Sequence, residues 1–106
     1  MPVVKGTAMS INHILKSRYQ KDYQSMLNLV GPILSFRILQ GEKEAVREYG
    51  LTIHIRSIID LQPTYRDTHH VRLIIPTRYP KENPQAIMVS SPVVAHPNWW
   101  VNGNWC

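Results

Sequence analysis

Apolar residues recur at helical spacing early in the chain and at every second position later. From Ser10, a good helix N-cap, apolar side chains return every three or four positions as far as Val30, and polar residues occupy much of the other side. Gly31 and Pro32 then end the pattern, because neither residue continues a helix well. The pattern predicts an amphipathic helix of about four to five turns.

Beyond this helix the apolar period changes to two, which is typical of strands with one buried face. Four runs have this character or are rich in β-forming residues: 34–38, 51–56, 70–75 and 86–90. The segments between them, 41–44, 62–68 and 76–84, favour antiparallel connections because a parallel crossover needs more chain. The pattern predicts an α+β fold: an N-terminal helix, then a four-stranded antiparallel meander, then an irregular segment.

Length and composition describe one small domain, 1–106, with a hydrophobic fraction of 43%. No stretch approaches the roughly 20 apolar residues of a membrane helix, and the N-terminus lacks the apolar run of a secretory signal. A single cysteine, Cys106, excludes an internal disulfide framework and fits a reducing compartment. We therefore expect a soluble, cytoplasmic protein with no membrane partner.

The formal charge is +5, from twelve basic and seven acidic residues. The basic residues are scattered singly and form no tight cluster with interleaved aromatic residues, so the pattern argues against a nucleic-acid surface. An acidic protein partner is at least as well supported, because a basic surplus also favours association with acidic surfaces.

The five histidines offer little support for a metal site. Only His69 and His70 are adjacent, and in a strand they would point to opposite faces. The chain has neither Cys-x-x-Cys nor His-x-x-x-His spacing. We expect no metal and no cofactor.

Two short motifs carry the candidate chemistry. The first is a proline-rich loop, 76–84, which contains Tyr79-Pro80; its prolines fix φ and remove backbone donors, so the loop is stiff and cannot extend the sheet. The second is the run His96-Pro97-Asn98-Trp99-Trp100-Val101-Asn102-Gly103-Asn104-Trp105-Cys106. A cysteine thiolate is a nucleophile, although a lone cysteine is commonly a small buried hydrophobe instead.

In this order and spacing, the two motifs and the helix-plus-meander pattern resemble the ubiquitin-conjugating enzyme family. The similarity includes the number of residues between the histidine and the cysteine, and it covers the first two thirds of such a domain. The chain also departs from the family: Asn83 precedes Pro84 where two adjacent prolines are common, 60–70 lacks paired glycines, and tryptophans replace smaller residues. These departures fit a divergent, bacterial relative better than a standard eukaryotic one.

The resemblance implies a role for each motif residue. Cys106 would accept ubiquitin or a ubiquitin-like protein from an activating enzyme as a thioester, and then pass it to a lysine or a ligase. Asn98 would support the oxyanion or hold the active-site loop, although Asn is also an ordinary turn residue. His96 would order the loop by hydrogen bonding, Pro97 would stiffen it, and Asn102-Gly103 would supply a turn with φ > 0.

Other expectations concern partners and the stiff loop. By resemblance, Tyr79 and Pro80 belong to the structural surroundings of the active site. The exposed basic face of the helix, with Lys16, Arg18 and Lys21, would dock the activating enzyme and a ligase, or it is an ordinary solvated face. The three tryptophans either line the approach to the cysteine or pack under the loop.

Family members continue beyond the cysteine into helices, one of which packs on the sheet. We therefore expect a domain that is C-terminally incomplete, with Ile53, Ile55, Val71 and Leu73 on an open sheet face. A carboxylate beside the thiol would disfavour the thiolate, so the 106-residue chain alone should be a weak or inactive enzyme. The alternative function is a non-catalytic binding module of the same fold, in which the cysteine is incidental.

Overall fold

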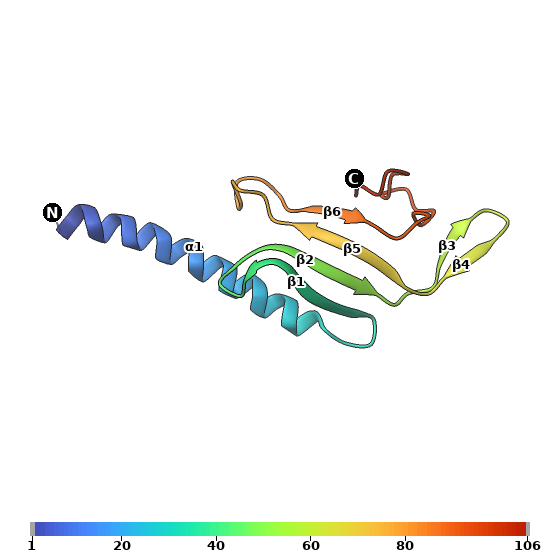
Figure 1. Cartoon of the computed structure of the whole chain (residues 1–106), viewed down its shortest axis with the longest axis horizontal. Helices are drawn as coiled ribbons and strands as arrows, with labels where there is room; N and C mark the ends of the chain where they lie inside the picture. Colours follow the sequence, from blue (N-terminus) through green and yellow to red (C-terminus); the bar gives the residue numbers. More distant parts are fainter. Residues whose placement is uncertain (1, 106) are drawn as a thin grey trace.

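The computed structural model describes the backbone of residues 2–105 and the side chains of residues 16–105. A helix is followed by a four-stranded antiparallel sheet with the order β1-β2-β5-β6 and by a separate β3–β4 hairpin (Figure 1). The elements are α1 (Pro2–Leu29), β1 (Leu34–Glu42), β2 (Ala45–Ile53), β3 (Ser57–Asp60), β4 (Thr64–Arg66), β5 (His69–Ile74) and β6 (Gln85–Met88). The predicted helix and four-stranded meander are confirmed.

Helix α1 begins at Pro2, so the prediction that it starts after Ser10 was wrong. Proline is well tolerated in the first turn of a helix, where its missing N–H has no intrahelical partner. The predicted end is confirmed, because α1 stops at Leu29, just before Gly31 and Pro32. The second half of α1 packs on β1 and β2.

The sheet has one covered face, and its register aligns apolar residues from all four strands. Phe36 lies opposite Leu51, Leu51 opposite Val71, and Val71 opposite Met88. Strand β1 continues past the predicted residue 38 to Glu42, and β2 begins at Ala45, earlier than the predicted residue 51. The pairing of the two strands has a bulge just before Gly41, and a short turn then connects them. Gly41 has φ 91° and a Cβ there would lie 2.3 Å from the carbonyl oxygen of Ala45, so only glycine fits.

The β3–β4 hairpin was not predicted. Residues 51–56 were expected to form one strand, but β2 ends at Ile53, and 62–68 was expected to be a loop but contains β4. Strands of three or four residues are too short to produce a clear period. Arg56, which directly precedes β3, contacts Tyr65 of β4, with its guanidinium 4.7 Å from the ring centroid.

Two clusters of buried residues lie on the covered face of the sheet. The helix cluster consists of Val46, Tyr49 and Ile75, with α1 side chains packed against it. The C-terminal cluster consists of Val71, Met88 and Val94, and the segment after β6 supplies part of its cover.

The expectation of an open sheet face was therefore wrong for Val71 and only partly met by the other three residues. Val71 is only 3% exposed, and Ile53 and Leu73 are half-buried. Ile55 is exposed, but it lies beyond the end of β2. The segment after β6 covers apolar residues that the resemblance had assigned to a later helix.

Within residues 2–105, no helix combines the length and apolar character that crossing a membrane requires.

Candidate active site

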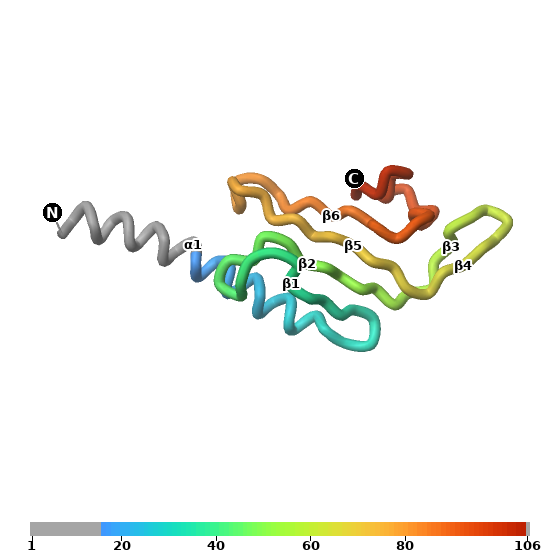
Figure 2. Tube along the Cα trace, viewed as in Figure 1, coloured from blue at the N-terminus to red at the C-terminus, as the bar shows by residue number. Residues whose placement is uncertain are grey.

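The segment 91–105 leaves β6, turns, and comes back to its edge (Figure 2). On the way out, the Ala95 N–H donates to the carbonyl oxygen of Ile58 in β3 at 2.8 Å. On the way back, the Met88 N–H donates to the Gly103 carbonyl at 2.7 Å, and the Trp105 N–H donates to the Ala86 carbonyl at 3.0 Å. The return brings Trp105 beside the turn that begins at His96.

His96 organises the first turn of this segment. Its Nδ1 accepts a hydrogen bond from the Asn98 N–H at 3.0 Å, and its carbonyl oxygen accepts one from the Trp99 N–H at 3.1 Å. The His96 side chain is exposed and Asn98 is half-buried. Because Nδ1 accepts a backbone N–H, it is the unprotonated nitrogen of the ring.

The second turn depends on Gly103. This residue has φ 93°, as the Asn-Gly pair predicted, and the Asn102 side-chain oxygen accepts a hydrogen bond from the Asn104 N–H at 3.0 Å. A Cβ at Gly103 would lie 2.4 Å from the carbonyl oxygen of Met88. Glycine is therefore required both for the backbone angle and for the close approach to β6.

Aromatic rings connect the two ends of the segment. The Trp105 ring stacks on His96, with centroids 5.8 Å apart and 24° between planes, and meets Trp99 edge-on at 5.0 Å. Trp99 packs on the C-terminal cluster, whereas Trp100 and Trp105 are about half exposed. The tryptophans thus divide between packing and exposure. Cys106 lies outside the described residues, and Trp105 directly precedes it.

Tyr79 anchors the proline-rich loop to α1. Its hydroxyl donates to Asp22 and accepts a hydrogen bond from Arg18 Nε at 3.2 Å, and its ring lies 5.7 Å from that of Tyr19. Burial, and then the hydrogen bond to Asp22, raise the pKa of Tyr79, so its hydroxyl remains protonated. The exposed Pro80 follows across a cis peptide bond.

The structure therefore divides the predicted site residues into two groups. Tyr79 and Pro80 precede β6 and belong to the α1 side of the sheet, with Tyr79 packed on the helix cluster. His96, Pro97 and Asn98 follow β6 and lie next to the C-terminal cluster, where Trp105 joins them.

The three basic residues of the helix, Lys16, Arg18 and Lys21, are all exposed on α1. Arg18 is also engaged within the chain, because it lies 3.5 Å from Asp22 and contacts Tyr79. The candidate docking face and the proline-rich loop therefore share a side chain.

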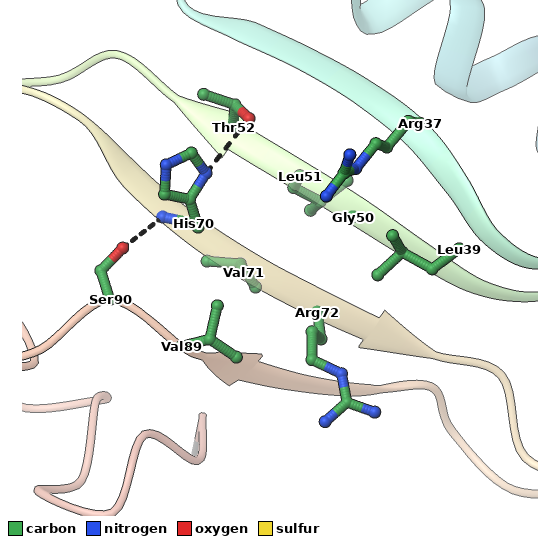
Figure 3. A pocket seen from close by; sticks show the side chains of 10 residues that line it. All are labelled: Arg37, Leu39, Gly50, Leu51, Thr52, His70, Val71, Arg72, Val89 and Ser90. Carbon is green, nitrogen blue, oxygen red and sulfur yellow. Dashed lines mark hydrogen bonds between the residues drawn. The ribbon is translucent and has the colours of Figure 1, made fainter.

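A shallow pocket of about 530 Å³ lies on the other face of the sheet (Figure 3). In it, His70 Nδ1 lies 3.3 Å from the Thr52 hydroxyl, and the His70 N–H donates to the Ser90 hydroxyl at 2.7 Å. Arg37 and Arg72 flank the pocket, which contains none of the predicted site residues.

In the part of the chain that the structure describes, no three His, Cys, Asp or Glu side chains are grouped as a metal site. His69 is buried and His70 is exposed, so the two lie on opposite faces, as alternation along a strand predicts.

Two further residues support the site but carried no signal in the sequence. Arg66 in β4 donates to the carbonyl oxygen of Pro92 at 2.7 Å and to His69 at 3.0 Å. Neither residue belongs to a motif, and only the folded chain shows that Arg66 links His69 to the segment that leads to His96.

No protein-family model matches the chain, and no curated protein matches its sequence. Several solved structures are similar, among them three ubiquitin-conjugating enzymes. A Plasmodium vivax ubiquitin conjugating enzyme E2 is 20% identical with a TM-score of 0.62, over 84% of this chain and 75% of that one. Human ubiquitin-conjugating enzyme E2 G1 is 18% identical with a TM-score of 0.57, over 88% and 68%. A Plasmodium falciparum ubiquitin conjugating enzyme E2 is 18% identical with a TM-score of 0.61, over 85% and 74%.

These similarities show the fold. The chain has the fold of ubiquitin-conjugating enzymes in a divergent sequence, as its motifs and element order predicted. At identities of 18–20%, a shared fold does not specify which reaction the chain performs.

Proposed function

We propose that this chain is a ubiquitin-conjugating-type acyl carrier. It accepts ubiquitin or a ubiquitin-like protein on Cys106 from an activating enzyme and passes it to a lysine or to a ligase cysteine. One observation carries the proposal: in the fold of ubiquitin-conjugating enzymes, Trp105, which directly precedes Cys106, stacks on His96 of the His-Pro-Asn turn.

The proposed chemistry is two acyl transfers without any redox change. The Cys106 thiolate attacks the thioester carbonyl that joins the modifier to the activating enzyme; a new C–S bond forms and the activating-enzyme cysteine leaves as a thiolate. A lysine amine then attacks the Cys106 thioester, forms a C–N bond, loses a proton and releases the Cys106 sulfur. Transfer to a ligase cysteine repeats the first exchange.

Asn98 is the proposed donor to the oxyanion that forms in each transfer. A positioned amide donor contributes about 2.7–4 kcal/mol in a site that excludes water. The hydrogen bond from the Asn98 N–H to His96 Nδ1 at 3.0 Å supports this role, because it fixes the backbone from which the Asn98 side chain projects. His96 and Pro97 then serve to order the turn.

The exposed basic face of α1 is the proposed docking surface for the activating enzyme and a ligase. Lys16 and Lys21 present positive charge there, and the charge of Arg18 is partly offset by Asp22. An acidic partner surface would complement this face.

The direct test supplies the protein, expressed to the natural end of its gene, with ATP, an activating enzyme and its cognate ubiquitin-like protein. We expect an adduct that survives a non-reducing gel and disappears with a thiol reductant. Cys106→Ser should convert it to an ester that the reductant does not cleave, and Cys106→Ala should form no adduct. Asn98→Ala should slow transfer by about 100-fold or more, as expected when one oxyanion donor is lost.

The alternative is a binding module of the same fold that carries no acyl group. It predicts that no tested pair of activating enzyme and modifier yields an adduct, while binding to a pathway protein persists in Cys106→Ala. That combined result would replace the acyl-carrier proposal.

A further inference from the structure

Arg66, at the end of β4, lies where four segments meet. Its Nε donates to Nδ1 of His69 at 3.0 Å, and its Nη1 donates to the carbonyl oxygen of Pro92 at 2.7 Å. Its Nη2 lies 3.6 Å from the sulfur of Met88. One guanidinium therefore joins the β3–β4 hairpin, β5, β6 and the segment that leads to His96.

The hydrogen-bond partners of His69 indicate which of its two ring nitrogens carries the proton. The side chain is only 2% exposed. An arginine N–H can only donate, so Nδ1 of His69 accepts and carries no proton. The carbonyl oxygen of Ile55, 2.8 Å from Nε2, can only accept, so Nε2 carries the proton and donates it. His69 is the neutral Nε2–H tautomer, tied to the chain between β2 and β3.

The guanidinium of Arg66 is held by neutral groups. Among the described residues, none of the ion pairs involves Arg66; its acceptors are an imidazole nitrogen, a carbonyl oxygen and a thioether sulfur. The planar guanidinium presents its donors in fixed directions, and hydrogen bonds from a charged donor are stronger than neutral ones. This geometry is suited to fixing the position of a carbonyl group.

The carbonyl that Arg66 binds belongs to the segment that enters the His-Pro-Asn turn. Pro92 is held by Arg66, and the Ala95 N–H is held by the Ile58 carbonyl at 2.8 Å. Val94 between them is 8% exposed in the C-terminal cluster. The segment is therefore fixed at both ends, and His96 follows it directly.

We propose that Arg66 and His69 are positioning residues for the turn His96-Pro97-Asn98. His69 orients the guanidinium of Arg66, which sets the Pro92 carbonyl and, through the backbone, the turn. The inference rests on the proposed function, because the position of Asn98 affects acyl transfer only if Cys106 carries the acyl group.

The first test compares Arg66→Met with Arg56→Met, a matched control at an exposed arginine that directly precedes β3 and contacts Tyr65 of β4. Arg66→Met should lower the maximal rate of single-turnover charging by about 10- to 100-fold, the loss expected from a small misplacement of a catalytic group. The activating-enzyme concentration for half-maximal rate should change by less than about twofold, because docking is unaffected. Arg56→Met should leave both values unchanged. Equal effects of the two substitutions would overturn the inference.

Arg66→Lys serves if the methionine variant does not fold, which thermal unfolding would show. Lysine keeps the charge and the stem, but its ammonium cannot reproduce the arginine fork to His69 and Pro92. Its maximal rate should also fall. A lysine variant with the rate of the unaltered chain would contradict a positioning role.

The second test is rescue at His69. His69→Gln keeps one acceptor for Arg66 and one donor for the Ile55 carbonyl, so its rate should stay within about threefold of the unaltered chain. His69→Leu removes both and should fall as far as Arg66→Met. If glutamine is as impaired as leucine, His69 acts only by filling space and the inference fails.

Nuclear magnetic resonance tests this inference independently of the proposed function, because the signals do not require Cys106 to be charged. The His69 imidazole should show a protonated Nε2 and an unprotonated Nδ1, and the Trp105 indole signal should move in Arg66→Met but not in Arg56→Met. If the chain never charges but these signals behave as expected, the proposed function fails and the coupling from Arg66 to the turn stands. A protonated Nδ1, or an unmoved Trp105 signal, would overturn the coupling even in a chain that charges.

Discussion

The two ends of the covered sheet face are held by different interactions. At the helix cluster, α1 satisfies its own backbone hydrogen bonds and contributes side chains, with rings such as Tyr23, Phe36 and Tyr49 packed edge to face at 5.6–5.8 Å. At the C-terminal cluster, an irregular segment depends on distant residues for its backbone hydrogen bonds, including those from Arg66 to Pro92 and between Met88 and Gly103.

Because of this difference, we expect the helix cluster to determine the stability of the fold and the C-terminal cluster to determine the geometry of the proposed site. The helix cluster is dry enough that burial, its main cause, raises the pKa of Tyr49 to about 12. The His96-Pro97-Asn98 turn lies next to the other cluster, where the chain path is set by a few individual hydrogen bonds. Substitutions at the helix end should therefore lower global stability, and substitutions at the C-terminal end should change the site locally.

The largest effect on stability should come from the helix cluster. Tyr49, 3% exposed, contacts the ring of Phe36, and its truncation to alanine leaves a cavity. Tyr49→Ala should lower the free energy of unfolding by about 3–5 kcal/mol, as for other buried aromatic residues. Urea unfolding measures the change. Tyr65→Ala is the matched control, since Tyr65 is 47% exposed, and should cost less than about 1 kcal/mol.

The second effect is expected at the C-terminal cluster. Gly103→Ala would place a Cβ 2.4 Å from the Met88 carbonyl oxygen at φ 93°, a backbone conformation that costs a non-glycine residue about 1–3 kcal/mol. We expect the segment to detach locally, so that amide exchange at Met88 speeds up while the urea midpoint moves less than in Tyr49→Ala.

The matched control for this substitution is Gly31→Ala. A Cβ at Gly31 would meet nothing within 4 Å, so stability should stay close to that of the unaltered chain. A Gly103→Ala variant with unchanged exchange at Met88 would contradict the view that single contacts hold this segment.

The smallest effect on stability is expected for an ion pair in the sheet between the two clusters. Arg72 donates two hydrogen bonds of 2.8 Å to the buried Glu48, and these lower the pKa of that carboxyl below its usual value. The pair joins β2 to β5, so it should influence both ends equally.

The sign of the pH dependence follows from this shift. Because the pKa of Glu48 is lowered in the folded chain, its contribution is present above the unfolded pKa of about 4.5 and is lost as pH falls through the folded value. Glu48→Gln should cost less at neutral pH than Gly103→Ala and should flatten the acid side of the stability curve. The measurement is urea unfolding between neutral pH and pH 3. If Glu48→Gln and the unaltered chain lose stability equally as the pH falls, the Glu48 carboxylate does not contribute to stability.

Much of the fold could be predicted because its signals are local. The helical spacing that ends at Val30 and the alternation around Leu51 and Val71 determine which faces are buried. The φ > 0 position of Gly103 also followed from the local Asn-Gly pair. The β3–β4 hairpin could not be predicted, because strands this short have no measurable period, and neither could the start of α1 at Pro2.

The candidate site was predicted only as a set of residues. One motif contains His96, Pro97, Asn98 and Cys106, but the spacing within a motif does not predict which distant residues stabilise its turn. The sequence gives no reason for Arg66 to meet Pro92, because these residues lie far apart in the chain and neither repeats with a period.

The amino-acid sequence by itself therefore determined the end of the helix, the four strands of the main sheet, the apolar residues that share one face of that sheet and the motif that contains Cys106, because propensity and alternation act between near neighbours. Only the tertiary structure decided that the segment after β6 covers Val71, that Tyr79 packs against α1 and not against the His-Pro-Asn turn, and that Arg66 donates hydrogen bonds to both His69 and Pro92. Those contacts depend on where distant backbone groups come to lie, which no local pattern encodes.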